Sequence, residues 1–192
     1  MDVSVIRHTR LDIDSDRCYG QSEVELAPGF AEELASYRLQ LAEPFCQVYS
    51  SPLRRCTQLA GQFSERVETS SELLEYDFGD WEMKNWDDID QQQLQHWMQD
   101  FVYVNPPNGE TLVQMSARVA SFIERLRAQN HERVLIVTHA GVIRCIWAHL
   151  LNIPLAEVFK LAVGYGEPMT FQLAASPEQD IVFTGSFEFR VG

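Results

Sequence analysis

The sequence has few cysteines, no long apolar run and a shortage of basic residues. Its four cysteines form no Cys-x-x-Cys pair, which argues against a zinc knuckle. No apolar run reaches the ~18 residues of a membrane-spanning helix, and no signal-peptide pattern precedes the first apolar segment. We therefore expect a reduced, soluble, cytoplasmic protein in which Cys46 and Cys145 are small core side chains.

Basic residues are outnumbered by acidic ones. Lys and Arg total 15 against 28 Asp and Glu, and the net charge is −13 at pH 7. Nucleic acids and anionic membranes would be repelled by such a chain, so we expect neither as a partner. A small anionic substrate would require basic side chains gathered at one site, where they override the field of the whole protein.

The size and composition suit one folded domain. The chain has 192 residues, of which 45% are hydrophobic and 11% aromatic, and it contains no internal repeat. We expect a single domain over residues 1–192 with a sizeable core. The sequence leaves the oligomeric state open.

Strand and helix patterns alternate along the chain, which is typical of an α/β fold with a mostly parallel sheet. The continuously apolar run 134–137 predicts a strand covered on both faces. The last two strands are expected to form an antiparallel pair. The predicted strands are 3–6, 46–49, 134–138, 170–173 and 181–183, and the predicted helices are 30–41, 53–67, 86–98, 109–129 and 141–151.

Several polar side chains follow the predicted strands. In open α/β sheets ligands bind beyond the carboxyl ends of the strands, so these side chains can converge on one pocket. An acidic segment, ELLEYDFGDWE, has Glu75 near its start and Gly79 as a predicted turn. The candidate site residues are Arg7, His8, Arg55, His139 and Glu75, whereas Arg54, His96, His131 and His149 are assigned to solvent or to structural roles.

This set of side chains suits phosphoryl transfer without a metal or cofactor. Arginine offers a planar fork of donors to phosphate oxygens, and a neutral histidine nitrogen is a nucleophile toward phosphorus. A second, protonated histidine adds a donor, and a carboxylic acid can protonate the departing oxygen. Zinc binding by His8 and His139 is a weaker alternative, because the nearby arginines would repel a cation.

Each residue alone has a plainer interpretation. His8 could end a strand, His139 could cap a helix, Arg55 could pair with an acidic neighbour, and Glu75 could be a solvated carboxylate. The joint pattern in chain order favours the functional interpretation.

That joint pattern resembles the phosphoglycerate-mutase-like branch of the histidine phosphatase superfamily. The matching segments include Arg7-His8-Thr9, a helix start at 51–56, the Glu75 segment at 73–82, and two further segments at 107–111 and 138–141. The resemblance implies a three-layer α/β/α sandwich of the phosphoglycerate-mutase-like type. It also implies that His8 is the phosphorylated nucleophile, that Arg7, Arg55 and His139 hold the phosphate, and that Glu75 is the proton donor.

The sequence departs from the family pattern at four positions. Thr9 and Ala140 stand where glycine is usual, Met83 follows Glu82 in place of another glycine, and Asp14 replaces a frequent asparagine. A carboxylate would repel phosphate, so Asp14 receives no binding role. These changes affect the details of the pocket and leave the nucleophile in place.

The segment 17–26, RCYGQSEVEL, is similar to a stretch of α-ribazole phosphatases, which remove the 5′-phosphate of α-ribazole phosphate in cobalamin nucleotide-loop assembly. The resemblance makes Tyr19, Gly20 and Gln21 candidate substrate-binding residues, with the Tyr19 ring as a platform for a nucleotide base or, equally, packed inward. The alternatives are a broad-specificity or sugar-phosphate phosphatase, a non-catalytic module that binds phospho-ligands and, less well supported, a metal-dependent phosphatase. Mutase activity is expected to be absent.

Overall fold

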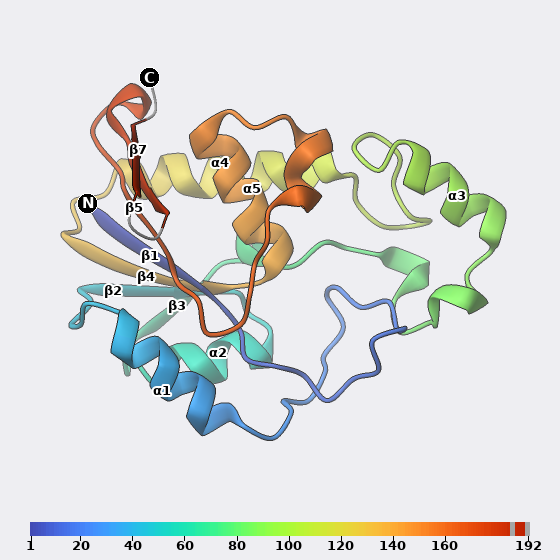
Figure 1. The fold of residues 1–192 in the computed structure, drawn as a ribbon, viewed down its shortest axis with the longest axis horizontal. Coiled ribbons are helices and arrows are strands. Elements are labelled where there is room, and N and C mark those ends of the chain that lie inside the picture. Colours follow the sequence, from blue (N-terminus) through green and yellow to red (C-terminus); the bar gives the residue numbers. More distant parts are fainter. Residues whose placement is uncertain (185–186, 191–192) are drawn as a thin grey trace.

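The computed structural model describes residues 1–184 and 187–190, and a seven-stranded sheet organises them (Figure 1). The strand order is β3-β2-β4-β1-β5-β6-β7. The strands are β1 (Asp2–Arg7), β2 (Gln47–Ser50), β3 (Val67–Thr69), β4 (Arg133–Thr138), β5 (Met169–Gln172), β6 (Ile181–Thr184) and β7 (Phe187–Arg190). The helices are α1 (Phe30–Gln40), α2 (Arg54–Ala60), α3 (Gln91–Gln99), α4 (Leu112–Arg127) and α5 (Ala140–Leu151).

The first four strands in chain order run parallel to one another, while β5, β6 and β7 are antiparallel to their neighbours. The mostly parallel sheet is thus confirmed, and so is the antiparallel pairing of the strands predicted at 170–173 and 181–183. Strand β7 was not predicted.

Helices cover both faces of the sheet, with α1 and α2 on one side and α4 and α5 on the other (Figure 1). The alternation of side chains along β4 divides the core accordingly. Val134 and Ile136 pack in the cluster with α4 and α5, whereas Leu135 and Val137 pack in the cluster with α1 and α2. The predicted strand covered on both faces and the α/β/α layers are confirmed.

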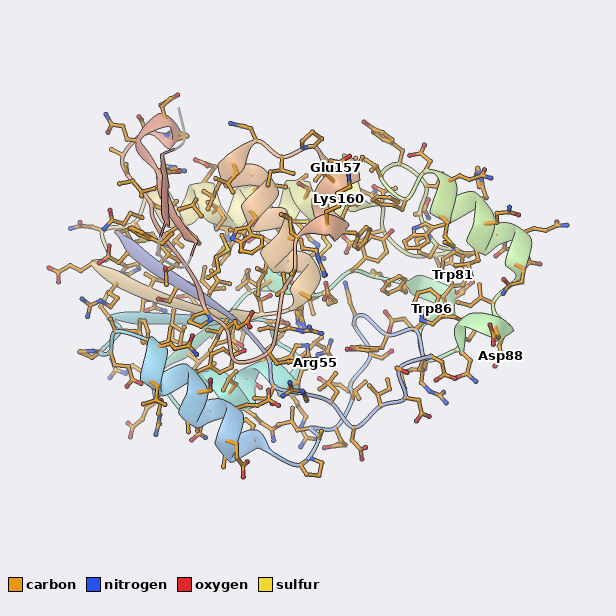
Figure 2. The ribbon with its side chains drawn as sticks, viewed as in Figure 1. Arg55, Trp81, Trp86, Asp88, Glu157 and Lys160 are labelled. Carbon is orange, nitrogen blue, oxygen red and sulfur yellow. The ribbon has the colours of Figure 1, made fainter. Side chains whose placement is uncertain are left out.

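A third cluster of buried side chains lies beyond the strand ends. It contains Cys18, Trp81 and Ile89, with Trp86 and Trp97 packed against it. Figure 2 shows Trp81 and Trp86 in this region, near α3 and away from the sheet. This cluster supports the segments that enclose the strand-end side chains.

Several predicted elements differ from the observed ones. The helix predicted at 53–67 ends at Ala60, because the residues that follow turn back and Val67–Thr69 pairs with β2. The helix predicted at 86–98 is interrupted before Asp90, whose side chain caps α3 by accepting from the N–H groups of Gln92 and Gln93.

Cys46 was predicted to lie in the core, but it is exposed, whereas Cys145 is buried as expected. Cys46 directly precedes β2, and its thiol donates to the Arg133 carbonyl at 2.9 Å at the exposed start of the sheet. Among the described residues, no helix combines the length and the apolar character needed to cross a membrane.

Candidate active site

The ends of β1 and β4 bring the two candidate histidines together. The strands pair in parallel with Arg7 opposite Thr138, and the His8 N–H donates to the Thr138 carbonyl at 2.9 Å. The next residues along the two strands are His8 and His139, whose ring centroids lie 5.1 Å apart. The predicted convergence at one end of the sheet is therefore present.

The His8 ring is buried, 2% exposed, and its orientation is fixed. Nδ1 lies 2.8 Å from the Thr9 carbonyl oxygen, which can only accept, so Nδ1 carries the proton and Nε2 keeps its lone pair. Burial lowers the pKa of His8 to about 3; the Thr9 hydrogen bond opposes this shift, and the charges of Arg55 and Arg7 add to it. His8 is thus neutral near pH 7, as a nucleophile must be.

His139 is fully buried at the start of α5. Arg55 Nε donates to its Nδ1 at 3.4 Å, which leaves Nε2 as the donor toward Ser51 Oγ at 2.8 Å. Burial lowers the pKa of His139 well below its usual value, and His8 and Arg55 lower it further. His139 is therefore neutral near pH 7.

Arg7 and Arg55 bring positive charge that no carboxylate neutralises among the described residues. Arg55 is fully buried and donates to the carbonyls of Ser22, at 2.7 Å, and Gly20. Arg7 donates to the Val163 carbonyl at 3.1 Å and to the Tyr165 hydroxyl at 2.8 Å. Hydrogen bonds to neutral oxygens orient both guanidinium groups and leave their charge available to an anion.

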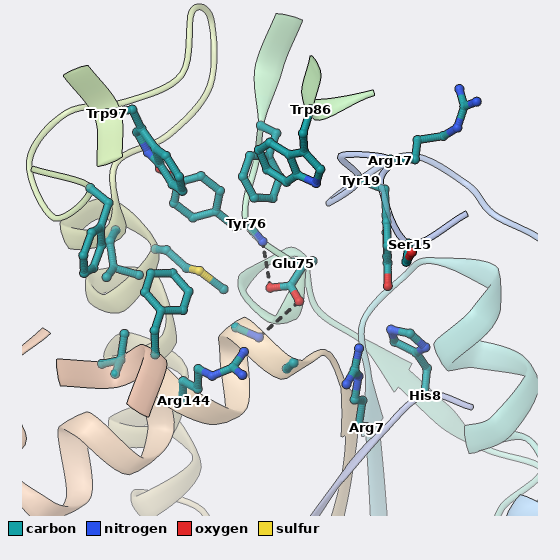
Figure 3. Close-up of a pocket in the computed structure, with 18 residues that line it drawn as sticks. Arg7, His8, Ser15, Arg17, Tyr19, Glu75, Tyr76, Trp86, Trp97 and Arg144 are labelled. Carbon is teal, nitrogen blue, oxygen red and sulfur yellow. Dashed lines mark hydrogen bonds between the residues drawn. The ribbon is translucent and has the colours of Figure 1, made fainter. Parts of the chain in front are cut away.

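The Glu75 carboxylate is held by two backbone N–H groups. Oε1 accepts from Tyr76 at 2.9 Å and Oε2 accepts from Gly141, in the first turn of α5, at 3.1 Å. A Cβ on Gly141 would lie 2.2 Å from Glu75 Oε1, so any larger residue there would displace the carboxylate. Figure 3 shows Glu75 facing the same space as Arg7 and His8.

Arg118 on α4 clamps the segment that carries Glu75, a role that no motif in the sequence indicated. Its Nη1 donates to the carbonyls of Glu72 and Leu74 at 2.8 and 2.7 Å, and its Nη2 to the Glu75 carbonyl at 3.0 Å. Glu110 pairs with Arg118 at 2.6 Å. The segment at 107–111 thus positions Glu75 indirectly.

A cavity of about 300 Å³ is lined by Arg7, His8 and Glu75, whereas Arg55 and His139 are fully buried and absent from its lining (Figure 3). Its polar end contains Arg7, His8 and Glu75, and two further arginines, Arg17 and Arg144, also line it. Among the lining residues Glu75 is the single carboxylate. In a chain of net charge −13 this is the local gathering of positive charge that an anionic substrate requires. The opposite end is apolar and aromatic, with Tyr76, Phe78, Trp86, Trp97, Phe101 and Phe159.

The segment with the candidate substrate-binding residues is anchored by Glu82. Its carboxylate accepts from the backbone N–H groups of Gly20, Gln21 and Ser22 at 2.9–3.1 Å and from the Ser22 hydroxyl at 2.6 Å. A Cβ on Gly20 would lie 1.9 Å from the Tyr76 carbonyl oxygen. Gly20 and Gln21 are thus held against the protein and are absent from the cavity's lining, and their contact with substrate stays a prediction.

Tyr19 lines the cavity at its polar end, and its ring centre lies 5.9 Å from the Arg55 guanidinium carbon. Of the two alternatives open for this ring, the structure shows the one in which it faces the cavity.

The four departures from the family pattern leave the polar end intact. Met83 has a φ of 63°, the left-handed conformation that favours glycine, so a strained backbone accompanies this replacement. Ala140 and Thr9 are buried, and Asp14 is exposed. Asp14 is absent from the residues that line the cavity.

Other polar residues lie where the sequence assigned them. The Arg54 side chain is 65% exposed. His149 contacts Glu124 at 2.9 Å and His131 contacts Gln129 at 2.8 Å, away from the cavity. Within the described part of the chain, no group of three or more His, Cys, Asp or Glu side chains could hold a metal ion.

Comparison with known proteins identifies the class. The family model described as "Histidine phosphatase superfamily (branch 1)" matches residues 3–175. The chain belongs to this superfamily, as its motifs indicated. The prediction of a phosphatase is confirmed at this level, because relatives in the family are phosphatases.

Among the relatives is the adenosylcobalamin/alpha-ribazole phosphatase of Escherichia coli, 31% identical over 172 residues, which cover 84% of this chain and 85% of that protein. The crystal structure of the alpha-ribazole phosphatase from Shigella flexneri matches with a TM-score of 0.82 at 29% identity, covering 90% of each chain. A mycobacterial glucosyl-3-phosphoglycerate phosphatase in complex with VO3 matches with a TM-score of 0.76 at 26% identity, covering 89% of this chain and 92% of that one.

Proposed function

We propose that the chain hydrolyses phosphate monoesters through a phosphohistidine intermediate on His8. The observation that carries the proposal is the His8 ring itself: it is neutral, its Nδ1–H is committed to the Thr9 carbonyl, and Nε2 is left as a nucleophile beside unpaired arginines.

The reaction has two steps. In the first, the Nε2 lone pair forms a bond to phosphorus, the ester P–O bond breaks, and Glu75 donates a proton to the departing oxygen. In the second, Glu75 takes a proton from water, the oxygen of that water forms a bond to phosphorus, and the P–N bond breaks to release phosphate. Asp77 and Glu82 are less suited to this role, because neither lines the cavity and Glu82 binds the Gly20–Ser22 segment.

Arg7, Arg55 and His139 stabilise the phosphoryl group during transfer. The arginines bring positive charge where the phosphoryl oxygens develop negative charge, which is the role of Mg²⁺ in many other phosphoryl-transfer enzymes. A bound dianion favours protonation of His139, because it offsets the burial that keeps the ring neutral in the free protein. Protonated His139 carries a hydrogen on Nδ1, so it donates to the anion once Arg55 Nε turns from Nδ1 to the phosphoryl group.

The proposed substrate is α-ribazole 5′-phosphate. The likeness of the segment 17–26 to α-ribazole phosphatases supports it, as does the recurrence of that activity in the names of the relative from Escherichia coli and the structure from Shigella flexneri. Tyr19 faces the polar end of the cavity, where it can contact the group that bears the phosphate.

A second candidate is an ester that carries another acidic group. Arg144 lines the cavity, its Nε donates to the Leu161 carbonyl at 3.0 Å, and no ion pair is recorded for it in the described part of the chain. A carboxylate on the substrate could pair with it, as in the substrate named for the glucosyl-3-phosphoglycerate phosphatases. No sequence motif indicated this arginine, and the absence of mutase activity stays a prediction.

The test combines a substrate panel with trapping of the intermediate. We expect kcat/KM for α-ribazole 5′-phosphate to exceed that for 3-phosphoglycerate and for simple sugar phosphates. Acid-labile phosphate should appear on the wild-type protein during turnover and be absent from His8→Ala, which should be inactive. Labelled phosphate on His8→Ala would contradict the assigned nucleophile, and a higher kcat/KM for 3-phosphoglycerate would favour the second candidate.

A further inference from the structure

A second hollow on the surface adjoins the apolar end of the catalytic cavity. This hollow has a volume of about 610 Å³. We call this second hollow the aromatic groove. The residues that line it are Phe78, Trp86, Leu94, Trp97, Met98, Phe101 and Phe159. Five of these residues, Phe78, Trp86, Trp97, Phe101 and Phe159, also line the catalytic cavity. The two hollows are therefore adjacent, and a ligand in the catalytic cavity can contact the same aromatic rings that line the groove.

The rings of the aromatic groove support one another. Phe78 and Trp86 have centroids 5.7 Å apart, and Phe101 and Phe159 have centroids 4.9 Å apart, both in edge contact. The guanidinium carbon of Arg144 lies 5.8 Å from the Phe159 ring centre. The groove is thus a preformed surface positioned next to the charged end of the cavity.

Apolar side chains in the groove remain open to solvent. Phe159 is 53% exposed and Met98 is 63% exposed. Exposed aromatic surface that continues from a polar pocket is typical of a ligand site, in which a few polar groups orient the ligand and apolar walls bury the rest of it. The polar end fixes what this ligand must carry, because Arg7, His8 and Glu75 receive a phosphate ester.

We propose, on the basis of the function proposed above, that the aromatic groove binds a planar, apolar ring system in the leaving alcohol. The substrate class is then a phosphate monoester whose alcohol carries a heteroaromatic or other flat apolar group at some distance from the phosphate. Trp86, Trp97 and Phe159 determine this specificity. Tyr19 acts at the other end, beside Arg55 and the phosphate. A benzimidazole nucleoside monophosphate belongs to this class, and a free sugar phosphate does not.

The experiment compares two esters that share the same phosphorylated ribose. The readout is kcat/KM for α-ribazole 5′-phosphate divided by kcat/KM for ribose 5-phosphate, which lacks the ring system. The wild-type ratio should be at least about tenfold, and Phe159→Ala and Trp86→Ala should each reduce it by about tenfold, the effect of one lost aromatic contact. Tyr103→Ala is the matched control, because Tyr103 is 72% exposed and lines neither hollow.

A binding measurement separates this inference from the proposed reaction. The Kd of α-ribazole 5′-phosphate for His8→Ala, measured by calorimetry, should rise about tenfold in His8→Ala/Phe159→Ala. If wild-type protein hydrolyses neither ester but this Kd still responds to Phe159, the reaction fails and the groove stands. If both esters are hydrolysed with a ratio that Phe159→Ala and Trp86→Ala leave unchanged, the groove proposal is overturned and the phosphatase chemistry survives.

Other occupants of the groove would give different results. A second copy of the chain would appear as a dimer in light scattering that Phe159→Ala dissociates, with no change in the substrate ratio. A membrane surface would appear as co-sedimentation with phosphatidylglycerol vesicles that Phe159→Ala abolishes. Either outcome, with an unchanged ratio, would overturn the assignment to the leaving alcohol.

Discussion

Burial keeps the His8 imidazole neutral, and this has a consequence for stability at acid pH. The folded-state pKa of about 3 lies below the unfolded value of 6.5. Between these values the unfolded chain binds more protons, so the free energy of unfolding falls as pH decreases from about 6.5 toward 3.

We expect His8→Ala to reduce this pH dependence by about 2 kcal/mol between pH 7.5 and pH 5. The measurement is urea denaturation at both pH values in phosphate-free buffer. The comparison uses the difference between the two values, because truncation of a buried ring also removes packing. His96→Ala is the control, since His96 is exposed. An unchanged pH dependence in His8→Ala would mean that His8 is protonated in the folded protein.

Gly141 has no side chain, and this leaves room for the Glu75 carboxylate. Gly141→Ala should displace Glu75 and lower kcat by about 100-fold for esters with poor leaving groups, within the range of general acid catalysis. The loss should be smaller for p-nitrophenyl phosphate, whose leaving group needs no proton, and Glu75→Gln should show the same pattern. Gly61→Ala, at the end of α2, is the control. Equal losses for both kinds of ester would indicate a positioning defect without acid catalysis.

At the level of elements, Glu82 ties the segment with Tyr19 to the segment with Glu75. Burial raises the pKa of Glu82. The hydrogen bonds from Ser22, Gln21 and Gly20 together lower this pKa by more than burial raises it, so the net shift is downward. Glu82→Gln would place an amide NH2 among these donors.

We expect Glu82→Gln to destabilise the protein by about 2 kcal/mol and to raise KM, because Tyr19 loses its support. Thermal unfolding and steady-state kinetics measure both effects. Asp88→Asn is the control at an exposed carboxylate of the same region (Figure 2). The stabilisation from the lowered pKa is present above about pH 4.5 and is lost as pH falls through the folded value. Wild-type stability and KM in Glu82→Gln would show that the loop holds its position without this carboxylate.

The sequence predicted those elements whose signal is local. The apolar run of β4 and the three- and four-residue spacing along α4 each lie within one segment, and both elements are present. Strand β3 was missed because its pairing with β2 depends on contacts between distant residues. The charged residues at the strand ends were found because parallel strands place their ends at one edge, whereas Arg118 and Arg144 lie within helices whose orientation the sequence does not give.

The roles of Gly141 and of the aromatic groove also depend on contacts between distant residues, which the sequence does not reveal. Gly141 is required by the carboxylate of Glu75, a residue 66 positions earlier in the chain. The aromatic groove draws Phe78, Trp86, Trp97 and Phe159 from separate segments, so no short motif contains it. Met83 could be recognised from the family pattern as a departure, but its positive φ became visible only in the structure.

For the molecule as a whole, the distribution of charge matters more than its sum. The net charge of −13 surrounds a cavity lined by Arg7, Arg17 and Arg144, with Arg55 beside it. Bringing several unpaired guanidinium groups together costs folding free energy through mutual repulsion and lost hydration. A bound oxyanion offsets this cost, so stability and phosphate binding are linked.

Inorganic phosphate at about 100 times its Kd should stabilise the folded protein by about 2.7 kcal/mol, which corresponds to a rise in Tm of about 5–10 °C for a chain of this size. The measurement is thermal unfolding with and without phosphate, with sodium chloride at matched ionic strength as the control for general screening. Arg55→Lys and Arg7→Lys keep the charge but lose the planar fork, so each should reduce the shift by more than half.

Because arginines supply the positive charge, the rise in Tm with phosphate and the turnover of p-nitrophenyl phosphate should both persist in EDTA. Loss of both in the chelator and their recovery with Mg²⁺ or Zn²⁺ would instead show that a metal ion holds the phosphate, and the assignment of that role to Arg7, Arg55 and His139 would fail.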